Sequence, residues 1–341
     1  MSNYTYTSDI VADALFRAGE PTDGTSDFHS QAFTYLNNLY MQLCRGGAEL
    51  VPTIHEDWAW LRKPAPGVLI IEPPITAGTA SVTLGSASVT LSTTPVNYAS
   101  SNLSTATWFF RVTGHPDIFR VSAHTSGTTS LTLDSVYTGT TASAASYTLF
   151  RTDYNLATDV LRIVAPMRVY RNAGWAGRDD YKIYMCDLDA LEEAYPLGLI
   201  DQGVPDYFAM IGENTQGTKR IRFNRCGGGS GSSSTVYRVE YEYLIVPTAL
   251  TSPGTSEVPL VPYEWRHLLA DYLVAYIFGV KNDERAGPAV QAAQNGLRGM
   301  SLEHRYKITT ATRNLFKLLP RTGVGRQVAP KRTEQGHIIS G

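Results

Sequence analysis

The stretch SLTLDSVYTGTTASAASYTLFR, residues 130–151, decides how the chain is organised, because its composition excludes a surface helix. From residue 77 to residue 148, 29 of 72 residues are Ser or Thr and only four are charged. Thr and other β-branched residues favour strands, and Gly, Asn and Ser separate the short alternating runs. We therefore predict a small Ser/Thr-rich all-β module of about six strands over residues 77–151. The run ASVTL begins at residue 80 and again at residue 87, which fits two strands of one hairpin.

The N-terminal end has helical periodicity. Apolar residues recur at spacings of three and four over residues 9–18 and again from residue 28 to residue 43, before a Gly46-Gly47 pair. We predict a helical hairpin within residues 1–60, with Ser8 or Asp9 as the N-cap of the first helix.

The C-terminal end repeats this helical character. Residues 257–319 contain one broad apolar stripe that includes Leu268, Leu269 and Leu273, followed by a helix with Pro288 in its first turn. Residues 302–318 can extend that last helix. Gly, Pro and basic side chains then predict an extended basic arm over residues 320–341.

The remaining segments, residues 61–76 and 152–256, read as antiparallel strands with one short helix after Asp187. The predicted fold class is α+β. A helical domain made from both chain ends flanks an antiparallel β domain, and that β domain carries the inserted all-β module.

No pattern in the chain indicates catalysis, a cofactor or a metal. Cys44, Cys186 and Cys226 are far apart, the seven His residues form no metal-binding spacing, and the glycine-serine loop at residues 226–235 lacks the Lys of a phosphate-binding loop. Glu240 and Glu242 share one face of a predicted strand, but apolar residues occupy the other face, which favours an amphipathic strand over a paired-carboxylate site. We expect no catalytic, cofactor-binding or metal-binding residues.

The charge distribution is more informative than the net charge of −2. Residues 298–341 contain nine Lys or Arg and two Glu, which is +7, so the other 297 residues carry −9. A basic segment on an acidic body suits DNA phosphates or an acidic protein groove, and the sequence leaves both possibilities open. The candidate contact residues are Arg313, Lys317, Arg321, Arg326, Lys331 and Arg332.

Membrane insertion and secretion are not expected. The longest apolar run, residues 268–280, is interrupted by Asp271 and is shorter than the roughly 20 residues that cross a bilayer. The N-terminus lacks the basic start and apolar centre of a signal peptide. We expect synthesis in a cytoplasm.

The order of these parts resembles the head-to-tail connector, or adaptor, proteins of short-tailed bacteriophages. The resemblance rests on DIVADALFRAGEPTDGTSDFHSQAFTYLNNLYMQLCRGGAEL, EDWAWLRKPA, GVPDYFAMIGENTQGTKRIRFNRCG and YRVEYEYLIVPTALTSPGTSEVPLVPYEWRHLLADYLVAYIFGV, in that order. Within the insert, GTASVTLGSASVTL, FFRVTG, DIFRVSAHTSGTTSLTLDSVYTG and YTLFRTDYNLATDV follow the expected sequence of such a module.

The resemblance implies a structural virion protein at the head–tail junction, assembled in the host cytoplasm. Such proteins form a ring, usually of twelve copies, beneath the portal protein. The ring extends the channel for genomic DNA, which it contacts non-specifically, and presents a platform for the next tail component, a nozzle or tail-tube protein. A C-terminal segment, here residues 313–341, reaches the portal, and no catalytic residues are implied.

An alternative from another class is a carbohydrate-binding or host-adsorption protein of the tail that uses the inserted module. That function requires exposed aromatic side chains, for which Tyr98, Trp108, Phe109 and Phe110 are the candidates.

Overall fold

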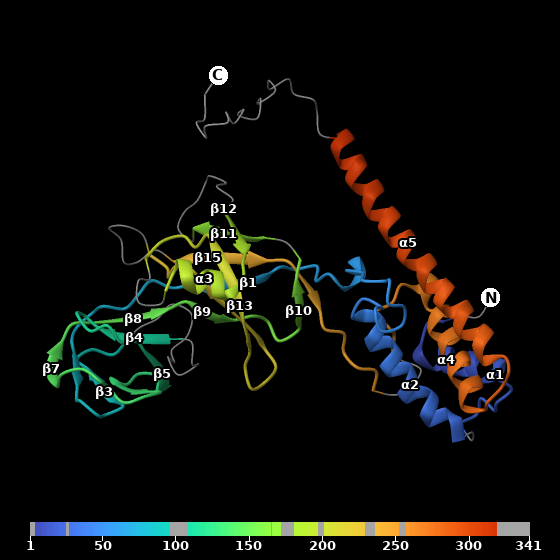
Figure 1. The fold of residues 1–341 in the computed structure, drawn as a ribbon, viewed down its shortest axis with the longest axis horizontal. Helices are drawn as coiled ribbons and strands as arrows, with labels where there is room; N and C mark the ends of the chain where they lie inside the picture. Colours follow the sequence, from blue (N-terminus) through green and yellow to red (C-terminus); the bar gives the residue numbers. More distant parts are fainter. Residues whose placement is uncertain are drawn as a thin grey trace. The chain divides into compact units, whose positions relative to one another are not determined.

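The computed structural model has a mixed α+β fold with its β structure in the middle of the chain, as predicted (Figure 1). It describes residues 4–24, 27–95, 108–164, 166–171, 181–196, 201–228, 236–251 and 257–318. The chain divides into two compact units, one of residues 1–56 and 250–341 and the other of residues 57–249. Predicted features that lie outside the described residues include Tyr98, most of the glycine-serine loop, residues 252–256 of the proline-bearing linker and the basic arm.

The first unit is built around a buried helix. Its elements are α1 (Thr7–Arg17), α2 (Asp27–Cys44), the 3-10 turn η3 (Tyr263–Trp265), α4 (His267–Val280) and α5 (Ala286–Leu318). Helix α4 contacts α1, α2 and α5, and its apolar stripe is buried as the sequence predicts, with Leu268, Leu269 and Leu273 at most 2% exposed. Apolar burial of this kind supplies most of the stability of a helical bundle.

The start of α1 differs from the prediction. The N-cap is Tyr6, not Ser8 or Asp9, and the helix begins at Thr7. The Asp9 carboxylate accepts a hydrogen bond of 2.9 Å from the Tyr6 backbone N–H, as the N3 residue of a capping box does. The Thr7 backbone N–H donates to the Glu257 carbonyl at 2.9 Å, so a segment distant in sequence fixes where the helix begins.

The helix ends follow the local sequence more closely. Helix α2 is followed by Gly46 and Gly47, which have φ values of 109° and 78°, and the Gly47 N–H donates to the Gln42 carbonyl at 3.2 Å. Left-handed glycines of this kind end helices, as predicted. Helix α5 continues without interruption to Leu318, which confirms that residues 302–318 extend the last helix.

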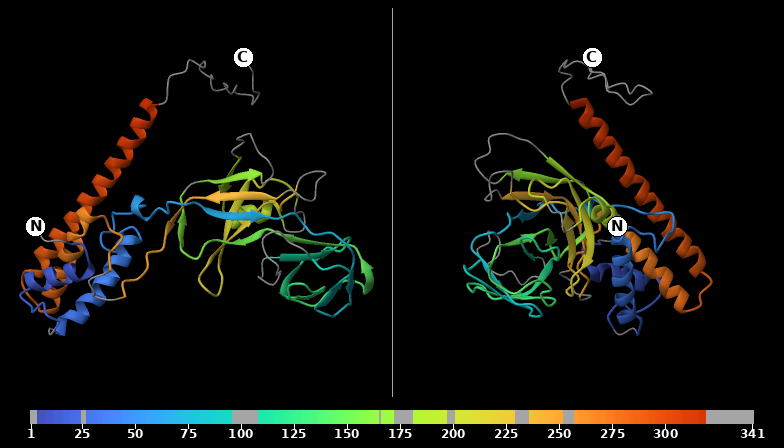
Figure 2. Two further views of the ribbon diagram at one scale, coloured as in Figure 1. Left: turned by 180° about the vertical axis from the view of Figure 1, so that it is seen from behind. Right: turned by 60° about the vertical axis from the view of Figure 1, so that its left-hand side comes forward.

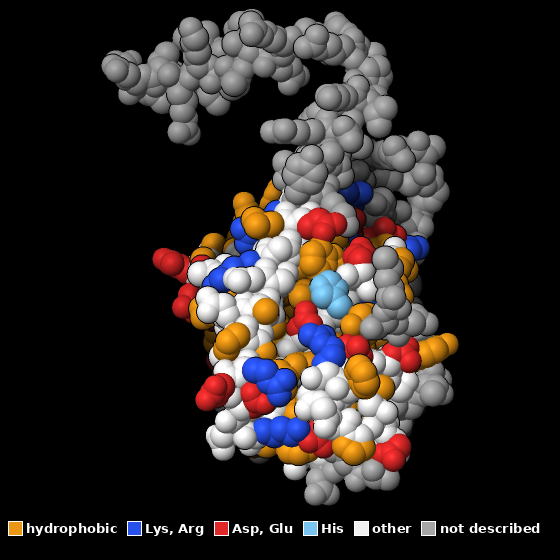
Figure 3. All heavy atoms as spheres, turned by 90° about the vertical axis from the view of Figure 1, so that its right-hand side faces the viewer, with side chains coloured by type: hydrophobic (Ala, Val, Ile, Leu, Met, Phe, Trp, Pro, Cys, Tyr) orange, Lys and Arg blue, Asp and Glu red, His pale blue; other side chains and the backbone are white. Residues whose placement is uncertain are grey.

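The face of the molecule shown in Figure 3 mixes charge types. Acidic, basic and hydrophobic side chains are interspersed on it.

The second unit contains a mixed sheet in the order β1-β15-β11-β12-β13-β14-β9. Its strands are β1 (Gly67–Ile71), β9 (Asp153–Asn155), β11 (Met167–Arg171), β12 (Tyr181–Met185), β13 (Tyr207–Glu213), β14 (Lys219–Phe223) and β15 (Tyr237–Tyr241). The 3-10 turn η1 (Ala59–Leu61), helix α3 (Leu188–Ala194) and a small sheet of β10 (Val160–Ile163) with β16 (Tyr243–Ile245) complete this part of the unit.

The expectation of a wholly antiparallel domain is wrong at one position. Strands β12 and β13 are parallel, with Tyr184 opposite Tyr207. The chain between these strands includes α3, and a crossover connection of this kind returns the chain in the same direction. The other described pairs of this sheet are antiparallel.

The amphipathic reading of residues 239–243 is confirmed. Val239, Tyr241 and Tyr243 are at most 3% exposed, whereas Glu240 and Glu242 are partly exposed. The run is nevertheless two strands, because β15 pairs with β1 and β11 while β16 pairs with β10.

The inserted module has a sheet of its own in the order β7-β2-β3-β6-β5-β4-β8. Its strands are β2 (Ala80–Val82), β3 (Ser88–Leu91), β4 (Trp108–Val112), β5 (Phe119–His124), β6 (Ser130–Leu133), β7 (Ala142–Ala145) and β8 (Tyr147–Arg151). The two ASVTL runs pair as an antiparallel hairpin, as predicted. Strand β7 has the sequence ASAA, which lacks β-branched residues, and the sequence pattern missed it. Strands β7 and β8 are consecutive in sequence yet lie at opposite ends of the order, and Figure 2 shows the strongly curled sheet that results.

A close approach between α4 and α5 generates a stability prediction. A Cβ atom on Gly296 would overlap Cδ2 of the buried Leu268, whereas a Cβ on Gly299 of the same helix would meet nothing within 4 Å. Gly296→Ala should therefore lower stability by about 1–3 kcal/mol through overpacking. Gly299→Ala should raise it by about 0.5–1 kcal/mol, because alanine favours a helix more than glycine does.

Thermal unfolding followed by circular dichroism at 222 nm would measure both variants. If Gly296→Ala were as stable as Gly299→Ala, the close packing of these two helices would be refuted.

Candidate functional site

The candidate contact residues from the sequence fall at the end of the chain. Arg313 and Lys317 lie in the last part of α5, whereas Arg321, Arg326, Lys331 and Arg332 lie outside the described residues. The described residues contain two polar clusters that the sequence pattern did not identify. One cluster holds the middle of α5, and the other holds the inserted module against the mixed sheet.

The first cluster surrounds Glu56, which is 9% exposed. Its carboxylate accepts a hydrogen bond of 2.6 Å from the Ser301 hydroxyl and another from Arg305, and His304 Nδ1 lies 3.3 Å away. All three partners lie on α5. Glu56 therefore fixes the segment after α2 to the helix that leads to the basic arm.

Two opposing effects act on the Glu56 pKa. Burial raises the pKa. The opposing effect is larger and comes from hydrogen bonds with Ser301 and Arg305, the positive charge of Arg305 and the contact with His304. The pKa of Glu56 therefore lies below its ordinary value of 4.5. Because the folded state favours the ionised carboxylate, this group stabilises the fold above the unfolded pKa.

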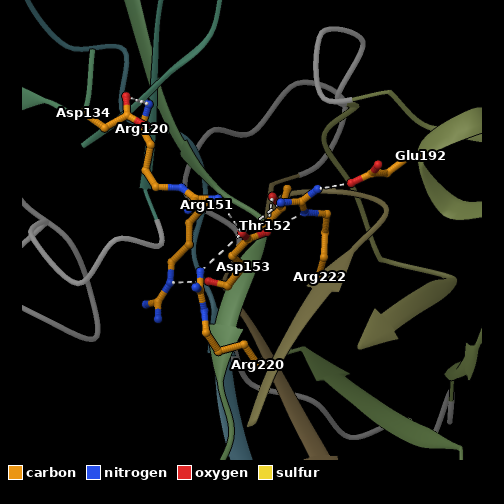
Figure 4. Close-up of polar contacts among 8 residues, drawn as sticks. All are labelled: Arg120, Asp134, Arg151, Thr152, Asp153, Glu192, Arg220 and Arg222. Atoms are coloured by element: carbon orange, nitrogen blue, oxygen red, sulfur yellow. Dashed lines mark hydrogen bonds and ion pairs between the residues drawn. The ribbon is translucent and has the colours of Figure 1, made fainter. Parts of the chain in front are cut away.

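The second cluster surrounds Asp153, which is fully buried in β9 (Figure 4). Arg222 on β14 lies directly opposite in the strand register, and its guanidinium donates two hydrogen bonds to the carboxylate, of 2.7 and 3.1 Å. Arg222 also donates to Glu192 of α3 at 2.7 Å. Bidentate charge-assisted bonds of this kind offset part of the cost of burying a charge.

Two further guanidinium groups approach the same carboxylate. Arg220 on β14 lies 3.6 Å and Arg120 on β5 lies 3.8 Å from Asp153 Oδ2. Arg120 belongs to the inserted module, where its backbone N–H donates to Asp134 at 3.2 Å. Figure 4 shows the three arginines approaching Asp153 from different directions. The cluster thus joins the module, the mixed sheet and α3.

A second ion pair lies close to this cluster in sequence. Glu72 is 1% exposed, and Arg151 Nη1 lies 3.5 Å from its carboxylate. The Arg151 Nε donates to the Asp153 carbonyl at 3.1 Å, and its guanidinium lies 4.2 Å from the centre of the Tyr154 ring. Since Arg151 ends β8 and Tyr154 lies in β9, these contacts fix the direction in which the chain leaves the inserted module.

Apolar packing supports the same junction. Phe109 of β4 stacks on Phe150 of β8 with ring centres 5.5 Å apart, and both pack with Cys226, which follows β14. The Arg120 and Arg222 guanidinium groups lie 5.5 and 5.9 Å from the Phe109 ring centre. Cation–π contacts and burial therefore reinforce the ion pairs.

Three of the four aromatic residues required by the carbohydrate-binding alternative are buried, and the fourth, Tyr98, lies outside the described residues. Trp108, Phe109 and Phe110 are at most 4% exposed and lie in the cores of the module and its junction. The expectation that they form an exposed binding face is wrong, because the alternating run WFFRV has buried residues on both faces.

The described part of the chain offers neither a metal-binding cluster nor a membrane-spanning helix. No group of three His, Cys, Asp or Glu side chains there could hold a metal ion. Every described helix is too short or too polar to span a bilayer.

Sequence signals for these clusters were present but incomplete. Arg220 and Arg222 alternate on one face of β14, which marks a basic strand face. The partner Asp153 is 67 residues or more away, so only the strand register reveals it. For the first cluster, the sequence around Glu56 offered no indication beyond the charge of that residue.

The buried cluster around Asp153 generates a second stability prediction. Asp153→Asn should lower the free energy of unfolding by about 3–5 kcal/mol, because the arginines lose the charge that balances them. Removal of the partly exposed Arg238–Glu240 pair by Arg238→Gln should cost less than about 1 kcal/mol. Urea unfolding followed by fluorescence would compare the two. Equal losses of stability in the two variants would contradict the structural role of the Asp153 cluster.

The Glu56 cluster generates a prediction about pH. Since the folded-state pKa is depressed, the stabilisation by Glu56 should be complete above about pH 5 and should decline as the pH falls below 4.5 toward the folded pKa. Glu56→Gln should lower stability at pH 7 and should make stability less dependent on pH below about pH 5. Unfolding midpoints measured from pH 3 to pH 7 would test this. If the midpoint of Glu56→Gln fell with acid pH as steeply as that of the original chain, the result would argue against the prediction.

Comparison with known proteins assigns no family. No protein-family model matches the chain, and no curated protein matches its sequence significantly.

Proposed function

We propose that this chain is a structural virion protein that forms an oligomeric ring between the portal and the tail of a bacteriophage, without catalytic activity. The ring, which has twelve copies in most members of the family that the chain resembles, extends the DNA channel and presents a surface for a nozzle or tail-tube protein. A helical domain made from both chain ends contributes to the ring, and the basic arm docks on the portal.

The observation that carries the proposal is the way the basic segment is attached. Helix α5 has 33 residues, which corresponds to about 50 Å, whereas α4 has 14 residues and spans about 21 Å. A single helix, held near its middle by Glu56, therefore leads from a packed helical unit toward the basic arm. A rigid stalk with a basic end suits docking on another component of an assembly.

Exposed apolar side chains agree with extensive contacts between proteins. Phe16 is 75% exposed on α1, and Leu302 is 67% exposed on α5. Met185 is 63% exposed on β12. These residues lie on three different elements, and only contiguous apolar patches mark an interaction surface, so they are separate positions at which contacts between proteins can be tested.

Electron microscopy of the purified chain, alone and mixed with the portal protein of the same genome, tests the proposal. We expect rings stacked on portals for the full chain, and loss of stacking with an unchanged circular dichroism spectrum for a chain that lacks residues 320–341. Particles that ignore the portal in every mixture would refute the connector function. Normal stacking of the truncated chain would refute only the docking role of the arm and would leave the connector function standing.

A further inference from the structure

A polar hollow of about 350 Å³ lies on the face of the mixed sheet opposite its core. Arg168 of β11 and Glu240 of β15 line the hollow and are register partners. Their strand neighbours Val169 and Val239 are buried in the core, so Arg168 and Glu240 lie on the other face of their strands. The volume of the hollow is typical of sites for small molecules.

Three prolines form an apolar part of the wall. Pro64 and Pro66 lie before β1, and Pro166 lies before β11. Because a proline ring fixes its own φ angle, these positions have little conformational freedom to lose when a ligand binds. The prolines can therefore pack against the organic part of a ligand.

The acids at the hollow are already balanced by cations. Three ion pairs involve its charged residues: Arg62–Glu242, Arg238–Glu240 at 2.9 Å and Lys63–Asp159 at 2.6 Å. Each pair is neutral, so these residues leave no net charge at the hollow.

Arg168 is different from the other charged residues that line the hollow. Its guanidinium makes no hydrogen bond or ion pair within the described part of the chain, since Glu240 pairs with Arg238. Directly opposite Arg168 on its other side is Lys182 of β12, which is also exposed and has no ion pair with a described residue. Like charges directly opposite each other in antiparallel strands are destabilising. Two adjacent positive charges beside the hollow therefore lack a described counter-charge.

We propose that this hollow binds a phosphate group between Arg168 and Lys182. A guanidinium can donate two parallel hydrogen bonds to phosphate oxygens, and a lysine ammonium attracts phosphate as a point charge. A phosphate monoester carries about two negative charges at pH 7, which matches the two cations, whereas a carboxylate carries only one. Arg168, Lys182 and the hollow are named the phosphate site below.

Free phosphate and a phosphomonoester present the same charged group to the phosphate site. The size of the hollow and its proline wall favour the monoester, because its organic part can occupy the space beside the two cations. A nucleoside monophosphate is a suitable probe of this class.

Thermal unfolding of the full-length chain, with ligand titrated at constant ionic strength, tests the inference. A ligand that binds the folded state raises the unfolding midpoint in a saturable way, from which an affinity follows. We expect such a rise with inorganic phosphate and with adenosine monophosphate, and none with acetate. Tighter binding of adenosine monophosphate would assign the site to a phosphomonoester, and equal affinities would assign it to free phosphate.

The double variant Arg168→Gln and Lys182→Gln should bind both phosphate probes at least fivefold more weakly. The change removes a repulsion between neighbouring strands, so we expect the double variant to fold, and its unfolding curve without ligand checks this.

A matched control removes two positive charges elsewhere. Arg45→Gln with Arg298→Gln replaces two exposed cations of the other unit and should leave the affinity within twofold of the original. The inference would be overturned if neither phosphate probe bound, or if both double variants weakened binding equally. Binding of a DNA strand without binding of either phosphate probe would also overturn it, because a phosphodiester carries one charge per phosphate.

The phosphate site does not depend on the proposed function, and the portal mixtures described above separate the two. A chain that stacks on portals but does not bind phosphate would keep the connector function and lose the phosphate site. A chain that binds phosphate at Arg168 and Lys182 but ignores portals would do the reverse.

Discussion

A carboxylate without exposure to water must be balanced by nearby cations, and in this protein Asp153 is balanced by arginines from two different sheets. Arg222 and Arg220 come from the strand beside it, and Arg120 comes from the inserted module. Burying the carboxylate is costly, and the bidentate Arg222 contact offsets much of that cost. The position of the module on the mixed sheet depends on this balance, because the ion pairs form only when both parts are in register.

The module itself is held together by a different kind of interaction. Its strands turn apolar residues inward and Ser or Thr outward, as in β6, where Leu131 and Leu133 are buried and Ser130 and Thr132 are exposed. Hydrophobic burial stabilises the module, while specific electrostatics orient it. The neutral exterior leaves few charges for long-range attraction, so its contacts with other proteins would depend on shape and hydrogen bonding.

In the helical unit, a polar contact again fixes a position within an apolar framework. Helix α4 is buried on nearly every side, and Gly296 allows α5 to approach it closely. Glu56 then binds three side chains on one turn of α5. This anchor matters for the proposed function, because a helix held near its middle keeps a fixed direction toward the basic arm.

Local sequence alone determined the ends of α2 and α5, the amphipathic strands and the two ASVTL strands of the module. Glycine conformations, helix periodicity and alternating polarity act over a few residues, so they can be read without knowing the fold. Tertiary structure decided what depends on distant partners: the parallel β12–β13 pair, the pairing of Asp153 with Arg120 and Arg222, and the first residue of α1 beside Glu257. It also decided that Trp108 and Phe109 are buried on opposite sides of one strand. These features depend on register and packing between segments far apart in sequence, and no local pattern encodes those distances.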